Sequence, residues 1–243
     1  CDVFFYEIAL KAGINNIAKI SREFGLGFPT GINLPGEKSG LIPDRKWKLD
    51  VKKQVWRPGE TIIAGIGQGY VLATPIQLAL MTARIANGGK KIKPTLLKSP
   101  ILQASNANSV KVSEENLNII KRAMEKVSLD EFGTGRNFRL GIKGVEMAGK
   151  TGTVQVRRIS TKERESEEGV IKNEDRIWEW RDHALYVGYA PMDKPRYAIS
   201  VIVEHGGSGS SKAGPIARDI MEATLTDDPT RFIPKNPIKK PLI

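Results

Sequence analysis

The sequence lacks several features that would settle the class of protein at once. Its 243 residues include one cysteine, at position 1, which excludes an internal disulfide and a zinc site built from several cysteines. No apolar run approaches the roughly 18 to 20 residues that span a bilayer. Residues 1–25 also lack the basic, apolar and small-residue order of a signal peptide. Any export signal or membrane anchor is therefore expected outside this chain.

Acidic residues are outnumbered as well, 27 against 38 Lys and Arg, which gives a formal net charge of +11. A basic balance is typical of nucleic-acid-binding proteins. Here, however, the cations are spread over residues 38–57, 90–98, 121–126 and 235–240, and no aromatic residues alternate with arginine as on a base-stacking platform. Attraction to an anionic polymer or lipid surface fits at least as well, so we expect no nucleic-acid partner.

The most informative stretch is residues 148–155, Ala-Gly-Lys-Thr-Gly-Thr-Val-Gln, which we interpret as an edge strand. A glycine inside a strand marks a place where another backbone or a ligand comes close. An extended substrate could add along this strand, with Lys150 attracting its negative charge. The alternative is a surface strand with an ordinary lysine and a glycine bulge. Alternation places Lys150 and Gly152 on one face and three polar side chains on the other: Thr151, Thr153 and Gln155.

Two helices have clear start signals. Thr74, followed by Pro75 and Gln77, predicts a capping box for a helix that ends at Asn-Gly-Gly, residues 87–89. This helix is apolar nearly all round, which predicts that it is buried. Ser113, followed by two glutamates, predicts the start of a second helix.

The chain begins with an apolar stripe of helical period over residues 3–20, interrupted near Gly13 and ended by Gly25. A helix that is apolar from its first residues is expected to pack against something, here a segment upstream of this chain. Residues 26–60 are rich in Gly and Pro and are interpreted as a long ordered loop with short helical pieces.

The second half of the chain predicts strands. Residues 183–190 and 197–203 read as two strands joined by a tight turn, which makes them antiparallel. His183 and His205 are interpreted as structural residues at the strand ends, because a Ser-His-Asp arrangement would need a nucleophile elbow that is missing. The charged segment 156–182 is expected to be a solvated loop, mobile around residues 167–169 and anchored by Trp178 and Trp180.

These elements predict an α+β fold, an antiparallel sheet flanked by helices plus a mostly helical subdomain. We expect residues 1–147 to be mostly helical, residues 148–226 to hold the sheet strands and the C-terminal helix, and residues 227–243 to form an extended tail. A flexible link over residues 206–211 leads to the last helix, from about Gly214 to Leu225. Three of its apolar side chains are expected to face inward: Ile216, Ile220 and Met221.

Several blocks, in one order, resemble the class B penicillin-binding transpeptidases. Together they extend over essentially the whole chain, and the resemblance implies a β-lactamase/transpeptidase-like fold without its N-terminal part. The blocks are Cys1-Asp2 followed by Val-Phe-Phe-Tyr, Gly65-Ile-Gly-Gln-Gly-Tyr70 with Thr74-Pro-Ile-Gln-Leu-Ala79, Lys150-Thr-Gly-Thr-Val-Gln155, Arg181-Asp-His-Ala-Leu-Tyr-Val-Gly-Tyr-Ala-Pro191 and Glu204-His-Gly-Gly207.

The resemblance also implies roles for single residues. Lys150 and the hydroxyls of Thr151 and Thr153 would hold the substrate carboxylate, and the Thr153 backbone N–H would be one of two oxyanion donors. Asp2 would be the third member of a Ser-x-Asp loop motif whose serine is expected immediately before Cys1.

The nucleophile of this family, the serine of a Ser-x-x-Lys motif, is missing. No serine in the chain has a lysine three positions later, and Thr95-Leu-Leu-Lys98 has the spacing with the wrong hydroxyl. We therefore expect the nucleophile upstream of Cys1 and the chain to be inactive alone. No cofactor is expected. A structural zinc at Cys1 would need the Asp and His ligands that some family members carry upstream; otherwise Cys1 is a small buried residue.

For the intact parent, the resemblance implies a serine-type D-Ala-D-Ala transpeptidase or carboxypeptidase that acts on peptidoglycan stem peptides and is trapped by β-lactams. It also implies a periplasmic domain held in the bacterial inner membrane by an N-terminal helix, with elongation-machinery membrane proteins as partners. Self-association of the fragment is expected through apolar surface that the missing part would cover. The alternatives are a division-type enzyme, a penicillin sensor of the same fold and a non-enzymatic binder of anionic polymers.

Overall fold

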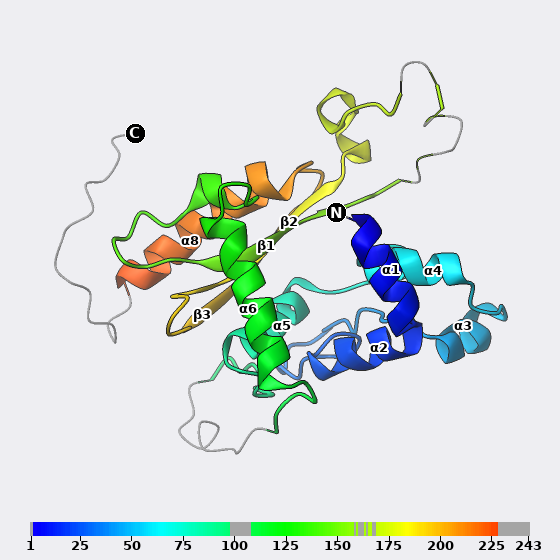
Figure 1. Ribbon diagram of the computed structural model, residues 1–243, viewed down its shortest axis with the longest axis horizontal. Coiled ribbons are helices and arrows are strands. Elements are labelled where there is room, and N and C mark those ends of the chain that lie inside the picture. Colours follow the sequence, from blue (N-terminus) through cyan, green and yellow to red (C-terminus); the bar gives the residue numbers. More distant parts are fainter. Residues whose placement is uncertain are drawn as a thin grey trace. The chain divides into compact units, whose positions relative to one another are not determined.

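The computed structural model describes residues 2–97, 108–157, 159, 163, 165–166 and 169–227. The chain folds into two compact units, Cys1–Ile120 and Lys121–Ile243, and each is described by itself. Figure 1 shows their helices and strands. The predicted tail beyond residue 227 lies outside the described residues. Across the described part of the chain, no helix has the length and apolar character needed to cross a membrane.

The first unit opens with two short helices in place of one long one. Helix α1 (Asp2–Ala12) and helix α2 (Ile14–Glu23) are separated by Gly13, whose φ of +75° lies in the left-handed region that favours glycine. This confirms the predicted interruption. Several large side chains of α1 are 44–59% exposed: Val3, Phe4, Phe5, Ile8 and Leu10. The described part of the first unit therefore leaves much of this apolar helix uncovered.

The segment predicted as a loop with short helical pieces contains helix α3 (Arg45–Lys52) and helix α4 (Pro58–Gly65). Asp44 begins α3, because its side chain accepts a hydrogen bond from the Trp47 backbone N–H at 2.7 Å. The same carboxylate pairs with Arg22 of α2 at 2.7 Å. One aspartate thus caps one helix and ties it to another.

Helix α5 (Pro75–Ala86) begins where the capping box predicts. The Gln77 N–H donates to the Thr74 hydroxyl at 3.3 Å, and the Thr74 N–H donates to the Gln77 side chain at 2.9 Å. Gln77 is fully buried, and its amide also donates to the backbone carbonyls of Phe28 and Ser39. The predicted burial of this helix is confirmed, since all its side chains after Pro75 are buried or half-buried.

Helix α6 (Glu114–Leu129) also begins as predicted, with the Ser113 hydroxyl accepting from the Asn116 N–H at 3.3 Å. The boundary between the two units falls inside this helix. The predicted division at residues 147 and 148 instead marks the start of the first strand, and it stays a prediction.

The second unit is built on an antiparallel sheet of strands β1 (Ala148–Val154), β2 (His183–Ala190) and β3 (Tyr197–Val203), in that order (Figure 1). Both long strands after the charged segment lie where alternation predicts them, and the α+β prediction is confirmed. One face of the sheet is the core of this unit. Its buried residues include Phe138, Ala184, Tyr186, Ala190, Met221 and Leu225.

Helix α8 (Gly214–Asp227) packs on that face, but it does so with a different stripe from the predicted one. Met221 is buried as expected, whereas Ile216 and Ile220 are 42% and 48% exposed. Small residues face inward in their place, namely Gly214 and Ala217. A side chain at Gly214 would collide with the ring of Phe138. The space left by the core, and not hydrophobicity, therefore decides which residues of α8 face inward at this point.

Two connecting segments are more ordered than expected. The link before α8 contains a π-helical turn, η5 (Gly209–Ala213), where a flexible segment was predicted. In the charged segment, Arg176 and Asp182 are buried and paired at 3.4 Å, and Asn173 donates to the same carboxylate at 2.9 Å. Residues 167 and 168, at the predicted mobile tip, lie outside the described residues.

Candidate active site

Lys150 lies at the surface of β1, which is the edge strand of the sheet formed by the described residues. It pairs across the sheet with Val187. Its ammonium donates to the Thr151 backbone carbonyl at 2.7 Å and lies 3.5 Å from the Thr151 hydroxyl. An exposed cation on an edge strand can attract an anionic ligand that adds along the strand.

The two threonines alternate with Lys150 and Gly152 along the strand, and the Thr151 hydroxyl nevertheless comes within 3.5 Å of the Lys150 ammonium. Thr151 stands opposite Tyr186 and Thr153 opposite Ala184 in the register of β1 and β2. Thr151 is half-buried and Thr153 is exposed. Gln155 is exposed just beyond the strand, which ends at Val154 because β2 begins opposite that residue. The predicted strand was one residue too long.

Gly152 has one close neighbour in the direction of a side chain. A Cβ built there would contact only the Cβ of Leu185, at 3.2 Å, within a radius of 4 Å. The backbone that comes close to this glycine belongs to the chain itself: a Cβ on Gly209 would lie 2.5 Å from the Gly152 carbonyl oxygen. A side chain at residue 152 would therefore press on Leu185, and part of the reason for glycine at this point of the sheet is the packing of η5.

The Thr151 hydroxyl has a partner that sequence reasoning missed. Its oxygen lies 2.9 Å from the hydroxyl oxygen of Thr134, and either atom could be the donor. Thr134 lies fourteen residues before the first residue of the strand, in a glycine-containing loop, so no local spacing could have indicated the contact. Within the described residues, the Thr151 hydroxyl thus lies near the Lys150 ammonium and the Thr134 hydroxyl.

Two buried tyrosines beside this strand are not acid–base groups at neutral pH. Burial raises the pKa of the Tyr186 phenol above its ordinary value, and burial together with the nearby Glu125 carboxylate raises the pKa of Tyr189 to about 12. Tyr186 also explains a glycine, because a side chain at Gly149 would collide with its ring and hydroxyl. These residues shape the strand and remain neutral.

Asp2, the other predicted catalytic residue, is the first residue of α1 and is exposed. It belongs to the first unit and β1 belongs to the second, so the predicted site draws on both. Cys1, expected to be a small buried residue unless upstream ligands complete a zinc site, lies outside the described residues, and so does Lys98 of the Thr95 motif. Within the described ranges, no three His, Cys, Asp or Glu side chains gather as a metal-binding group.

The histidines lie at strand ends, as predicted. His183 begins β2, and its Nδ1 accepts a hydrogen bond from the His205 backbone N–H at 2.9 Å. The two rings pack edge to face with centroids 4.7 Å apart. The Trp178 ring packs on the His205 ring, with centroids 4.4 Å apart.

The predicted anchoring role of the two tryptophans is wrong in one respect. Trp178 and Trp180 are 55% and 53% exposed, so neither is buried as a packing anchor would be. Trp178 touches His205 and Trp180 lies under Arg157, 5.9 Å from the ring centroid. The buried anchors of this segment are Arg176 and Asp182, because a paired and hydrogen-bonded charge can be buried.

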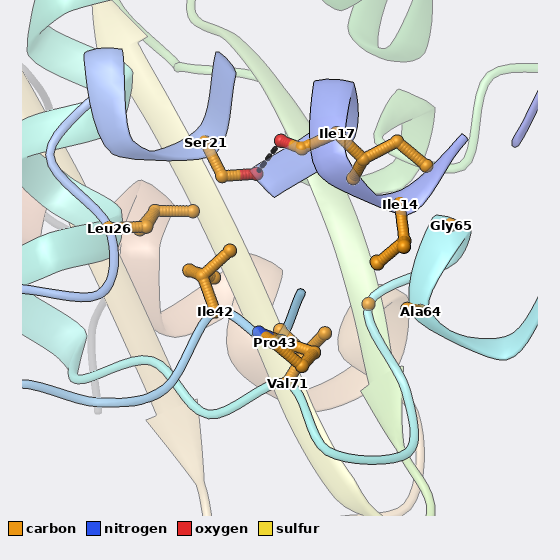
Figure 2. A pocket seen from close by; sticks show the side chains of 10 residues that line it. Ile14, Ile17, Ser21, Leu26, Ile42, Pro43, Ala64, Gly65 and Val71 are labelled. Atoms are coloured by element: carbon orange, nitrogen blue, oxygen red, sulfur yellow. Dashed lines mark hydrogen bonds between the residues drawn. The ribbon is translucent and has the colours of Figure 1, made fainter. Parts of the chain in front are cut away.

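The first unit contains a small apolar pocket of about 210 Å³. Figure 2 shows Ile14, Ile17, Leu26 and Ile42 among the side chains around it. The Ser21 hydroxyl at its wall donates to the Ile17 carbonyl at 2.8 Å. No charged side chain lines this pocket, which therefore offers no acid, base or anion-binding group for the predicted chemistry.

Comparison with known proteins identifies the class. Residues 1–222 match the family model of the penicillin-binding protein transpeptidase domain, and the chain belongs to this family. The peptidoglycan D,D-transpeptidase MrdA of Acinetobacter baumannii is 38% identical over 98% of this chain and 34% of its own length. The chain thus spans about a third of that relative.

Two of the solved structures that it resembles are penicillin-binding proteins 2. That of Pseudomonas aeruginosa, in complex with WCK 5153, is 37% identical with a TM-score of 0.77, over 93% of this chain and 46% of that one. That of Helicobacter pylori, in complex with MreC, is 34% identical with a TM-score of 0.78, over 93% and 38%. The predicted resemblance and transpeptidase fold are confirmed.

Proposed function

We propose that the full-length protein containing this chain is a serine D,D-transpeptidase that cross-links peptidoglycan stem peptides. The observation that carries the proposal is the Lys150-Thr151-Gly152-Thr153 stretch on the edge strand of the described sheet, where the exposed Lys150 ammonium lies 3.5 Å from the Thr151 hydroxyl. Family membership supports it, and so do the relatives named as peptidoglycan D,D-transpeptidases.

In the proposed reaction, a serine upstream of Cys1 loses its proton to its partner lysine and attacks the carbonyl between two D-alanines. The C–N bond breaks, the terminal D-alanine leaves with a proton, and an acyl-enzyme remains. An amine of a neighbouring stem peptide then takes the acyl group and restores the serine. Attack by water in place of the amine would be the carboxypeptidase reaction.

The residues of this chain bind and orient in that scheme. Lys150 and the Thr151 and Thr153 hydroxyls would hold the substrate carboxylate, since charge-assisted hydrogen bonds are the strong ones. The Thr153 backbone N–H would stabilise the oxyanion. Gly152 would leave room for the substrate chain, Gln155 would bind its far end and Asp2 would complete the loop motif beside the nucleophile.

β-Lactams would acylate the same serine, and a single N-terminal span would hold the domain on the periplasmic side of the inner membrane. An elongation role is favoured by the similarity to penicillin-binding proteins 2, one of which was solved with MreC. The exposed apolar side chains of α1 support self-association of the isolated chain.

The test is incubation with a fluorescent penicillin, followed by denaturing electrophoresis. We expect a covalent label on the full-length protein and none on the 26.8 kDa chain alone, because no serine in this chain has a lysine three positions later. Release of D-alanine from a stem pentapeptide should follow the label. A label on the short chain would contradict its inactivity. No label on the folded full-length protein, together with salt-sensitive binding to anionic polymers, would favour the non-enzymatic alternative.

A further inference from the structure

The hydroxyl pair of Thr134 and Thr151 extends the proposed function, on which this inference rests. We propose that Thr134 is a positioning residue: its hydroxyl donates to the Thr151 oxygen and so leaves the Thr151 proton for the substrate carboxylate. The oxygens are 2.9 Å apart, a normal distance for an O–H···O hydrogen bond. Nothing in the spacing of the Lys-Thr-Gly strand assigns a role to Thr134.

The proposed direction of this hydrogen bond agrees with a count of protons and lone pairs around Thr151. A threonine hydroxyl has one proton and two acceptor lone pairs, and an ammonium can only donate. The Lys150 ammonium lies 3.5 Å from the Thr151 oxygen. If Thr134 also donates, both lone pairs face donors, and the Thr151 proton must find an acceptor outside this group. A carboxylate is such an acceptor.

The opposite direction would work against binding. If Thr151 donated to Thr134, the Thr151 oxygen would present a lone pair to the incoming carboxylate, and two acceptors would face each other. A hydrophobic replacement of Thr134 would leave the Thr151 proton without a fixed direction, because a hydroxyl hydrogen rotates to suit its surroundings. The cost should therefore appear in reactions with ligands that carry a carboxylate.

The loop that carries Thr134 is held at its beginning by α6. The Gly135 N–H donates to the Val127 carbonyl at 2.7 Å, close to the end of that helix. A Cβ on Gly133 would lie 2.6 Å from the Lys126 carbonyl oxygen and would collide with that of Val127. Glycine on either side of Thr134 lets the loop lie against the helix end, which fixes the threonine backbone.

The loop is held at its other side by the core. Phe138 is 1% exposed, and its ring packs edge to face on Tyr186 with centroids 5.1 Å apart. Tyr186 is the cross-strand partner of Thr151. The two threonines are therefore fixed to one packed cluster, and the exposed Thr134 side chain can be changed without opening the core.

The experiment measures the rate of acylation of the full-length protein by a penicillin and by the methyl ester of the same penicillin. The ester keeps the reactive ring and loses the carboxylate charge. The variants are Thr134→Val, which keeps the shape and removes the hydroxyl, and Thr134→Ser, which restores the hydroxyl. The matched control is Thr224→Val on α8, where the hydroxyl bonds only within its own helix, to Ile220.

We expect Thr134→Val to slow acylation by the penicillin about 5- to 10-fold, the effect of losing one hydrogen bond, with no change for the ester. Thr134→Ser should restore the rate to within about two-fold, and Thr224→Val should match the wild type. An equal loss with both compounds would show a structural effect and overturn the inference. If the penicillin acylates the wild type and Thr134→Val at the same rate, the inference about Thr134 is overturned. The proposed function would still stand in that case. A wild-type protein that neither compound acylates would overturn both.

Discussion

Two lysines, one in each unit, have opposite environments: Lys48 is buried in an ion pair, and Lys150 lies at the surface of a strand. Lys48 of α3 is 2% exposed, forms an ion pair with Glu60 and lies 5.9 Å from the centroid of the Trp56 ring. Lys150 of β1 is exposed, and its ammonium donates to the adjacent backbone carbonyl. A buried charge needs a fixed partner to offset its lost hydration, whereas a surface charge can be reached by a dissolved anion.

Two threonines repeat the contrast. The Thr74 hydroxyl accepts the Gln77 backbone N–H and caps α5, so it belongs to the helix. The Thr151 hydroxyl contacts the side chains of Thr134 and Lys150 and caps no helix of the described residues. Substitutions in the first unit should therefore change the free energy of unfolding, and those on the strand should change the reaction with penicillin.

The largest expected effect is on stability, from Lys48→Met in the full-length protein. Met removes the ammonium and leaves the Glu60 carboxylate without its ion-pair partner; breaking a buried pair costs roughly 3 to 5 kcal/mol. The lower part of that range is expected, since the Glu60 side chain is 21% exposed. The urea dependence of circular dichroism measures it. The double variant Lys48→Met/Glu60→Leu should regain much of the loss, and a Lys48→Met protein as stable as the wild type would end the contrast between the two lysines.

Next in size is the effect of Lys150→Ala on acylation by penicillin. We expect a loss of about 100-fold, comparable to removing a key donor from an active site, and a change in unfolding free energy below about 0.5 kcal/mol, as for other exposed positions. The matched control is Lys143→Ala, an exposed lysine in the same unit, which should leave both quantities unchanged. A destabilised Lys150→Ala protein, or one that is acylated at the wild-type rate, would contradict the expected role of Lys150 in binding the ligand carboxylate.

A smaller effect separates the two threonines. Thr74→Ala should lower the free energy of unfolding by about 1 kcal/mol through loss of the helix cap, and leave the acylation rate of the folded protein unchanged. Thr74→Ser should recover most of it. Thr151→Val should do the reverse and slow acylation with little change in stability. If both variants affected the same measurement, the division of labour between the two threonines would be wrong.

Local signals predicted much of this fold because local physics decides those parts. The Thr74, Pro75 and Gln77 pattern fixes the start of α5 through hydrogen bonds three residues apart. Alternation locates β3, since one face of a strand must be apolar when it covers a core, and the tight turn before it makes β2 its antiparallel partner. The strand that contains Lys150 could also be predicted from alternation, and so could the position of the Lys150 ammonium at the surface.

What could not be predicted depends on contacts between distant segments. The inward face of α8 is made of small residues because Phe138 comes so close at Gly214, and hydrophobicity alone favours the wrong face. Thr134 was missed because the loop that carries it is folded back onto α6 before it meets β1. The site strand was readable from the sequence, and the residue that orients one of its hydroxyls was not.

The smallest expected effect is on stability at acidic pH, and it tests only the buried ion pair of Lys48 and Glu60. Burial of Glu60 favours its neutral form, but the hydrogen bonds from Lys48 and from the Arg57 N–H outweigh it and hold the pKa below the ordinary value. A carboxylate whose pKa is lower in the folded than in the unfolded state, where it is about 4.3, contributes stability above that pH and loses it as the pH falls through the folded-state pKa. Lys48→Met removes one of the groups that lower this pKa. The difference in urea midpoint between wild type and Lys48→Met should therefore be constant near neutral pH and shrink below about pH 4. A difference that stays the same down to the acid transition would mean that the Lys48–Glu60 pair does not set the acid response of the first unit.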